Sequence, residues 1–316
     1  GIAIAGALPA LTTILDRSRD GIPPLNPAAL NSLAVDLHLH STASDGALPP
    51  EDVVTRAAAV GLGAIALTDH DTLAGIAPAV EAGSREGIRV IAGCEFSVQA
   101  PWGEMHLLGY FLPLDSVPLQ DFLARCRADR ERRGSEMVER LRALGIPVTV
   151  GDVLREAQGG TVGRPHVARA LLQLKAVKSV QDAFDRFLGW GRPGFVHKRL
   201  PQFREVAELV HACGGVVSAA HLKDRGSRAV LAALRAEGLD AVETRHPTHD
   251  AEVRARLTDH ALALGLLRTG GSDWHGDAVG LSAAAELGGQ GVPMEWLGAL
   301  EEARLVGREP PVASAN

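Results

Sequence analysis

The stretch VDLHLHSTASDG, residues 35–46, sets two histidines and two aspartates into the alternating apolar pattern of a β-strand. Side chains of a strand point alternately to its two faces, so Asp36, His38 and His40 share one face and apolar residues occupy the other. Alone, such a face could be a hydrogen-bonded cluster in a protein core or a set of metal ligands. The other segments of the chain decide between these interpretations.

Six further apolar segments follow along the chain. They are residues 64–70, 89–98, 105–112, 215–221, 240–246 and 266–273. Amphipathic helical patterns lie between most of them, and several of these patterns end at a glycine suited to a left-handed C-cap. Strands alternating with helices predict an α/β fold with a parallel sheet that is covered on both faces.

The interval from residue 119 to 194 departs from this alternation, because it is helical and charged and contains no convincing strand. It predicts a helical lobe inserted into the α/β body. The arginines from Arg125 to Arg142 alternate with acidic residues at helical spacing, which is typical of a solvated helix face. The expected division is an extension over 1–34, a barrel over 35–118 and 195–308, the lobe over 119–194, and a tail over 309–316.

Composition limits the classes of function. The 316 residues carry a net charge of −6, so no overall charge attracts nucleic acid or an anionic membrane. The three cysteines form no CxxC pattern, which indicates neither a disulfide framework nor a thiolate zinc site, and we expect a cytoplasmic protein. The apolar run over residues 1–15 is shorter than a membrane span; a trimmed targeting segment is its alternative interpretation.

Polar groups of the ligand type gather at the ends of the predicted strands. Besides those of the first strand, they are Asp69, His70, Asp71, Glu95, His106, His221, Asp273 and His275. Active sites of barrels and open α/β sheets lie at the carboxyl ends of strands, where all of these fall except His106, which opens its segment. Histidine and carboxylate ligands without thiolates suit Zn²⁺, Mn²⁺ or Fe²⁺, and about nine ligands are too many for one ion. We therefore expect two or three divalent ions.

The motifs VDLHLHSTASDG, LTDHDT, IAGCEFS, the RPH of GRPHVA, and TGGSDWHG resemble those of the polymerase-and-histidinol-phosphatase (PHP) superfamily of metal-dependent phosphoesterases. The resemblance runs from about Val35 to Gly280. It is greatest to stand-alone phosphatases that act on nucleoside 3′,5′-bisphosphates and on short 5′-phosphorylated oligonucleotides. It implies a distorted (β/α)7 TIM-like barrel with an inserted helical subdomain, and the seven predicted strands agree with that fold.

The resemblance also implies how the ligands divide among the ions, with manganese the expected metal and zinc or iron as alternatives. One ion is expected on the group formed by His38, His40, Glu95 and Asp273. A second is expected on the group formed by Asp45, His70 and His275. Glu95 would bridge to a third ion held by His106 and His221. Asp36 and Asp71 are expected to orient imidazoles rather than to bind ions.

Arg164 and His166, in GRPHVA, are the main candidates for substrate contact and catalysis. They begin an amphipathic helix of the lobe, where a guanidinium, an imidazole and free backbone amides can meet on a phosphate. Weaker candidates for phosphate or substrate contacts are Ser41, Lys198, Arg199 and His246. His197 stands where the family pattern has a proline, and we expect a solvated loop histidine there. His275, or another histidine at the mouth, is the candidate general acid.

The predicted reaction is hydrolysis of a nucleotide phosphate monoester, such as that of 3′-phosphoadenosine 5′-phosphate, by in-line attack of a metal-bridged hydroxide. We expect a small nucleotide or short oligonucleotide as substrate, no stable nucleic-acid complex and no membrane association. The alternatives are a 5′–3′ exoribonuclease, a histidinol-phosphate or other phosphomonoester phosphatase, and a metal-stabilised interaction module. Stacking surfaces for a longer RNA are not obvious in a chain with four Trp, one Tyr and seven Phe.

Overall fold

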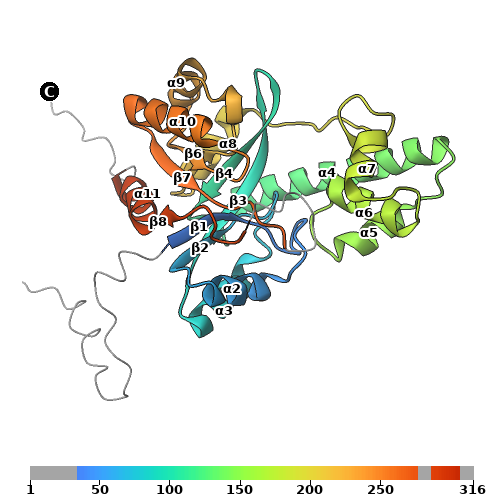
Figure 1. The fold of residues 1–316 in the computed structure, drawn as a ribbon, viewed down its shortest axis with the longest axis horizontal. Coiled ribbons are helices and arrows are strands. Elements are labelled where there is room, and N and C mark those ends of the chain that lie inside the picture. Colours follow the sequence, from blue (N-terminus) through green and yellow to red (C-terminus); the bar gives the residue numbers. More distant parts are fainter. Residues whose placement is uncertain (1–33, 277–285, 307–316) are drawn as a thin grey trace, which may run out of the picture.

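A computed structural model describes residues 34–276 and 286–306, and in it eight strands form one sheet in the order β7-β6-β5-β4-β3-β2-β1-β8 (Figure 1). The strands are β1 (Ala34–Leu39), β2 (Ala64–Leu67), β3 (Arg89–Ala100), β4 (Gly103–Tyr110), β5 (Val216–Ala219), β6 (Ala241–Arg245), β7 (Leu267–Gly270) and β8 (Val292–Pro293). The first seven occupy the seven segments predicted from the sequence. β8 was not predicted, because it is only two residues long.

The sheet nearly closes into a barrel, which confirms the predicted fold class. The segment that follows β7 returns to β1, where the Asp273 amide donates to the His38 carbonyl at 2.9 Å and the His40 amide donates to the Trp274 carbonyl at 3.0 Å. β8 pairs antiparallel with the start of β1. Two histidine-bearing segments that are far apart in sequence thus become neighbours.

β4 runs antiparallel to both of its neighbours, β3 and β5. A uniformly parallel sheet was the wrong expectation here, because only Pro101 and Trp102 separate β3 from β4, and a parallel crossover needs a dozen or more residues. The reversal explains the exceptional position of His106. A residue near the beginning of an antiparallel strand lies at the same end of the sheet as the carboxyl ends of the parallel strands.

Helices cover the outside of the barrel. They are α2 (Pro50–Ala59), α3 (Ile76–Glu86), α8 (Phe203–Ala212), α9 (Arg228–Ala236), α10 (Ala251–Leu264) and α11 (Met294–Val306). α10 shows how the sequence sets their limits: the Asp250 side chain accepts a hydrogen bond from the Val253 amide, and Gly265 ends the helix in the left-handed conformation. None of the helices in the described residues is both long enough and apolar enough to span a membrane.

The predicted helical lobe projects to one side of the barrel (Figure 1). It contains most of α4 (Val117–Ala143), α5 (Val150–Ala157), α6 (Arg164–Gln173), α7 (Val180–Ala183) and a π-helix over Phe184–Leu188. Met137, Leu141 and Leu171 belong to its own apolar cluster, whereas Leu119 and Leu123, in the first turns of α4, pack into the barrel core. α4 therefore joins the two cores as one continuous element. The exact domain boundaries stay predictions.

Candidate metal centre

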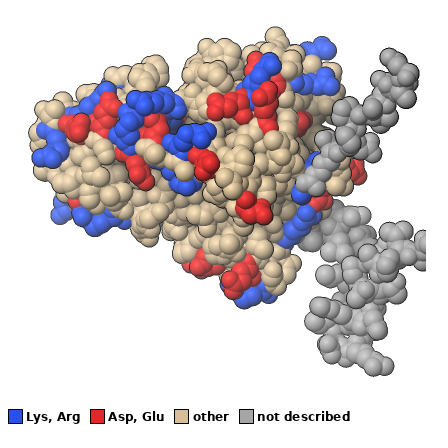
Figure 2. Space-filling view, turned by 180° about the vertical axis from the view of Figure 1, so that it is seen from behind, with Lys and Arg blue, Asp and Glu red and all other residues tan. Residues whose placement is uncertain are grey.

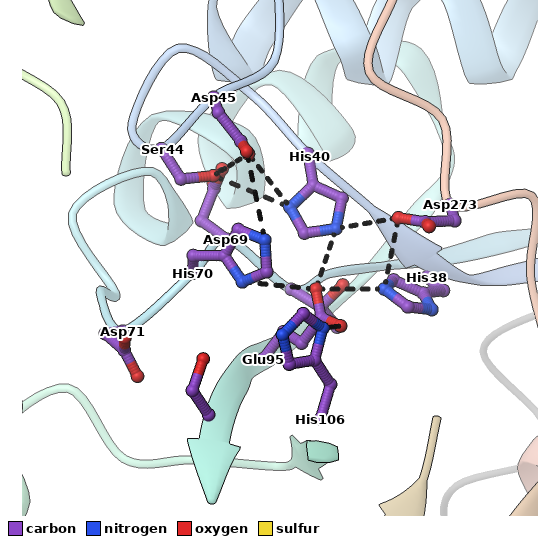
Figure 3. A network of polar contacts seen from close by, with 12 residues as sticks. His38, His40, Ser44, Asp45, Asp69, His70, Asp71, Glu95, His106 and Asp273 are labelled. Carbon is purple, nitrogen blue, oxygen red and sulfur yellow. Dashed lines mark hydrogen bonds and ion pairs between the residues drawn. The ribbon is translucent and has the colours of Figure 1, made fainter. Parts of the chain in front are cut away.

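The ligand-type side chains of separate strands converge at one end of the barrel. Those labelled in Figure 3 are His38, His40, Asp45, His70, Glu95, His106 and Asp273. They come from the end of β1, the loops after β1, β2 and β7, the middle of the long strand β3, and the start of β4. These groups therefore lie together at the end of the barrel where the carboxyl ends of the parallel strands meet, as the sequence predicted.

Glu95 lies at the centre of the cluster. Its Oε2 atom is 3.2 Å from His38 Nε2, 3.1 Å from His40 Nε2 and 3.3 Å from His70 Nδ1. These three nitrogens are buried and have no hydrogen-bond partner. Buried polar atoms of proteins are normally hydrogen-bonded, whereas metal-binding imidazoles direct one nitrogen at an ion. The donor set therefore fits divalent cations.

The first ligand group consists of His38, His40, Glu95 and Asp273, whose ligand atoms all lie within 4.8 Å of one another. Asp273 Oδ1 is 3.1 Å from His40 Nε2 and 3.4 Å from His38 Nε2. Asp273 has a φ of 50°. This sparsely populated backbone conformation is typical of functional positions held in place by their surroundings.

The second ligand group consists of His40, Asp45, His70 and His275. Asp45 Oδ1 is 3.3 Å from His275 Nε2, and Asp45 Oδ2 is 3.9 Å from His70 Nε2. His275 Nδ1 lies 2.8 Å from the Asp273 carbonyl oxygen, so Nε2 is the nitrogen left for an ion. A general-acid role would need that same nitrogen, which makes the ligand role the better supported of the two predictions for His275.

The third ligand group uses the other oxygen of Glu95. Oε1 is 2.7 Å from His106 Nδ1 and 3.1 Å from His221 Nε2. His70 joins Glu95 and His106 within the same 4.8 Å limit. With Oε2 on the first group and Oε1 on the third, Glu95 has the geometry expected of a bridging ligand.

Glu243, which the sequence analysis missed, orients the imidazole of His38 and holds the backbone of His221. Its Oε1 is 3.1 Å from His38 Nδ1, and its Oε2 accepts a hydrogen bond from the His221 amide at 2.7 Å. Carboxylates of this kind fix the ring orientation and tautomer of metal-binding histidines. The signal in the sequence was an acidic residue that follows two apolar residues in the strand AVETR and is fully buried there. His246, predicted at the mouth or rim, is buried with Nε2 3.4 Å from Asp273 Oδ2.

The orienting role predicted for Asp36 and Asp71 is wrong. Asp36 accepts hydrogen bonds from the backbone amides of Ser272 and Gly288, each at 2.9 Å, and so holds the segment after β7 in place. Asp71 points away from the imidazoles (Figure 3) and pairs with Arg130, whose Nε donates to Asp71 Oδ2 at 2.5 Å. The described contacts of both carboxylates thus fix the elements around the site.

The carboxylates and imidazoles of the three ligand groups shift one another's pKa values strongly. Burial raises the pKa of Glu95 and Asp273, but the neighbouring imidazoles outweigh this effect and hold the pKa of both carboxyls well below the usual range. Burial disfavours the charged form of His40, but the neighbouring carboxylates of Asp273 and Glu95 outweigh this effect and raise its pKa to about 10. A cation that binds His40 must displace this proton, so metal binding releases protons.

Two arginines of α4 contradict the predicted solvated face. Arg130 and Arg133 are 6% and 2% exposed. Arg133 Nε donates to the Val196 carbonyl at 2.7 Å, and burial, followed by the charge of Arg164, lowers the pKa of Arg133 to about 10. The rest of the run is at the surface, where Figure 2 shows basic and acidic side chains intermingled over the lobe. An alternating charge pattern did not show which arginines face inward.

Arg164 and Lys198 lie beside these two arginines, and we call Arg130, Arg133, Arg164 and Lys198 the cationic group. Lys198 Nζ donates to Ser97 Oγ at 2.7 Å and also pairs with Glu104. Glu104 Oε1 is in turn 3.1 Å from Nε2 of the third-group ligand His106. The cationic group therefore adjoins the metal ligands. Arg199, a weaker candidate, has a side chain that is 79% exposed.

Ser41 and His166 make hydrogen bonds within the protein, and their predicted phosphate contacts stay predictions. The buried Ser41 hydroxyl donates to Asp69 Oδ2 at 2.7 Å. His166 Nδ1 accepts a hydrogen bond from the Gly163 amide at 2.9 Å, and the ring also hydrogen-bonds the Ser44 backbone. Burial lowers the pKa of His166 to about 4. This neutral imidazole caps α6 and joins it to the loop that carries Asp45.

His166 gives a prediction on stability. Its folded pKa of about 4 lies below the unfolded value, so its contribution is complete above about pH 6.5 and is lost as the pH falls toward 4. Between pH 7.5 and pH 5, His166→Gln should lose about 2 kcal/mol less unfolding free energy than the wild type. Glutamine can still cap the helix at this position. Urea unfolding of both proteins at the two pH values measures the difference.

His211→Gln is the matched control for this experiment. The hydrogen bond to Asp240 raises the pKa of His211, so its contribution is present at low pH and is lost as the pH rises. That variant should therefore lose more stability than the wild type on acidification. An equal pH dependence of His166→Gln and the wild type would show that His166 is not buried as a neutral ring.

Similarity to known proteins identifies the family of this chain. The family model described as "PHP domain" matches residues 36–253. The chain belongs to the PHP family. It is 34% identical over 247 residues to the 5′-3′ exoribonuclease Rnm of Escherichia coli, an alignment that covers 76% of this chain and 84% of the relative. It is 32% identical over 254 residues to the 3′,5′-nucleoside bisphosphate phosphatase of Chromobacterium violaceum, covering 78% and 88% of the two chains.

A solved structure similar to the PHP chain supports the same family. A protein from Bifidobacterium adolescentis described as a metal-dependent phosphoesterase superimposes with a TM-score of 0.78 at 33% identity, covering 88% of this chain and 99% of the other. The PHP chain is therefore a metal-dependent phosphoesterase, and the predicted enzyme class and family are confirmed. The inactive interaction module is no longer needed as an alternative.

Proposed function

We propose that this enzyme hydrolyses one phosphate monoester of a nucleoside 3′,5′-bisphosphate and uses two or three divalent ions, with manganese as the expected metal. The observation that carries the proposal is the cationic group beside the ligand groups. A substrate with two phosphates needs one place where an ester is cleaved and a second that holds the other phosphate. The similarity to the C. violaceum bisphosphate phosphatase supports the same substrate class.

Bound divalent ions supply Lewis acidity and lower the pKa of coordinated water, which makes hydroxide available near neutral pH. The three ligand groups would hold such ions, and Glu243 keeps His38 in the orientation that directs Nε2 at the first group. Arg164 and Lys198 are proposed to hold non-bridging phosphate oxygens by charge-assisted hydrogen bonds. They thereby orient the ester toward the ligand groups and favour the developing negative charge.

Lys198 predicts a pH dependence for substrate binding. Burial, followed by the nearby charge of Arg130, lowers the pKa of Lys198 to about 8. Because only the charged form attracts phosphate, KM for the bisphosphate should rise by about tenfold between pH 7 and pH 10, the loss of one hydrogen bond between charged groups. Lys198→Arg stays charged over this range and should keep KM flatter.

The measurement is KM from pH 7 to pH 10 for the wild type and Lys198→Arg. The control is Arg199→Ala, because this neighbouring side chain is 79% exposed and lies outside the cationic group. The same rise of KM with pH in the arginine variant would exclude Lys198 as the titrating group. A flat KM between pH 7 and pH 10 in the Arg199→Ala control would also contradict the assignment, because Lys198 is intact in that variant.

A 5′–3′ exoribonuclease acting on short 5′-phosphorylated RNA is the second candidate, supported by the similarity to the E. coli exoribonuclease. Phosphate and nucleotide release from a 3′,5′-bisphosphonucleotide, a 5′-phosphorylated trinucleotide and histidinol phosphate separates the candidates. We expect the bisphosphonucleotide to be cleaved well and histidinol phosphate poorly. Failure to hydrolyse the bisphosphonucleotide with Mn²⁺, Zn²⁺, Fe²⁺ or Mg²⁺ would overturn the proposal. Metal analysis of the purified protein gives the number and identity of the ions.

A further inference from the structure

An exposed group of aromatic rings follows the π-helix of the lobe. Trp190, Phe195 and His197 form this ring cluster: the Trp190 ring centroid is 5.2 Å from that of Phe195 and 5.1 Å from that of His197, and the last two are 5.0 Å apart. The three rings meet at steep interplanar angles of 58°, 90° and 84°. The two contacts of His197 are edge-on and the Trp190–Phe195 contact is tilted, so the three rings pack against one another on the loop.

The exposure of Trp190 is unusual for its type. The side chain is 77% exposed, the largest value among the exposed large apolar side chains of the described residues. Trp274 and Trp296, by comparison, are 4% and 7% exposed. Tryptophan is highly buried on average, because it removes a large apolar area from water. An aromatic face that the fold leaves in solvent, but holds in place with two other rings, is suited to binding a flat ligand.

The ring cluster adjoins the cationic group. The guanidinium carbon of Arg164 lies 5.8 Å from the Phe195 ring centroid and equally far from that of Phe184, which fixes the arginine by cation–π contacts. His197 directly precedes Lys198, whose ammonium reaches Glu104 at the edge of the third ligand group. Contacts thus link the metal ligand His106 through Glu104 to Lys198, and Arg164 to the ring cluster.

We infer that the ring cluster stacks a base of a short single-stranded RNA, beyond the nucleotide held at the metal centre. The inference rests on the second candidate function, cleavage of short 5′-phosphorylated RNA at the same metal centre. Grooves that bind single strands combine positive charge along the backbone with aromatic side chains on which bases stack, and this stacking tolerates any sequence. A mononucleotide occupies only the metal centre and the cationic group. An oligonucleotide reaches the rings as well. The enzyme thus accepts both mononucleotides and oligonucleotides, and the lobe contacts only the longer substrates.

The test compares Trp190→Ala with the wild type on two substrates. For a 5′-phosphorylated pentaribonucleotide, the variant should show KM raised by about tenfold with kcat unchanged, the loss of one stacked base. For a nucleoside 3′,5′-bisphosphate both constants should stay at the wild-type values. Trp190→Phe keeps a ring and should restore most of the affinity. Leu262→Ala, which shortens another exposed apolar side chain (62%), is the matched control.

Tryptophan fluorescence gives a second measurement that needs no catalysis. With EDTA present, the pentaribonucleotide should quench the emission of the wild type, and Trp190→Ala should lose this quenching. Quenching that persists in the variant, or equal KM for the pentaribonucleotide in both proteins, overturns the stacking site while the proposed function stands. If the wild type hydrolyses neither substrate but shows the Trp190-dependent quenching, the proposed function fails and the stacking site is supported.

Discussion

Glu95→Gln is expected to lower turnover by about 1000-fold, the equivalent of several kcal/mol of metal-dependent stabilisation. The Glu95 carboxylate contacts His38, His40 and His70 through Oε2, and His106 and His221 through Oε1. Glutamine has nearly the same shape, but it lacks the negative charge and one of the two oxygens. The variant should therefore fold normally and bind fewer ions per chain. Steady-state kinetics and metal analysis of the same preparation measure both effects.

Glu81→Gln is the matched control, because its side chain is 77% exposed and pairs only with Arg85 on α3 among its described contacts. It should keep the turnover and metal content of the wild type. If Glu95→Gln kept them too, Glu95 could not bridge ions, and the assignment of the three ligand groups would fail.

Gly271→Ala should disable the centre although no ligand is changed. A Cβ at this position would lie 2.4 Å from the His38 Cβ, 2.5 Å from the His38 amide nitrogen and 2.9 Å from Asp36 Oδ1. The backbone after β7 must then move away from β1, which separates Asp273 from His40. Displacing a catalytic group by about 1 Å can lower the rate by about 100-fold, and overpacking costs about 1–3 kcal/mol. Turnover and urea unfolding measure the two losses.

Gly298→Ala is the control for this substitution. Gly298 lies in α11, and a Cβ there meets no atom within 4 Å. Alanine should stabilise the helix by about 0.5–1 kcal/mol and leave turnover unchanged. Wild-type turnover in Gly271→Ala would mean that the segment after β7 adapts without moving the ligands.

Strand positions and ligand types could be predicted from the sequence because they follow local rules. The period of two placed Asp36, His38 and His40 on one face, and strand ends placed His70 and Asp273 at the mouth. The reversal of β4 could also have been inferred. The short connection formed by Pro101 and Trp102 permits only a hairpin, but the alternation of strands and helices outweighed this signal.

Roles that depend on tertiary partners could not be predicted in this way. Glu243 acts through His38, which lies 205 residues earlier in the chain. Arg130 and Arg133 share the charge pattern of their exposed neighbours, and only the packing of α4 against the barrel decides which arginines turn inward. His166 looked like a phosphate ligand at a helix start, whereas its ring caps that helix. In each case the sequence showed the residue and its type, but it did not show which residue would be its partner in the fold.

The β3–β4 hairpin has a consequence for how the centre assembles. Glu95 and His106 lie on two strands that are joined by a tight turn, so the contact between them closes only a short loop of the chain. Glu95 and His221 are 126 residues apart, and the contact between them closes a long loop. The entropic cost of closing this loop is greater. The Glu95–His106 contact therefore costs less chain entropy to form than the Glu95–His221 contact. The complete centre exists only after the barrel has closed, and ion binding thus favours the closed chain over every partly folded one.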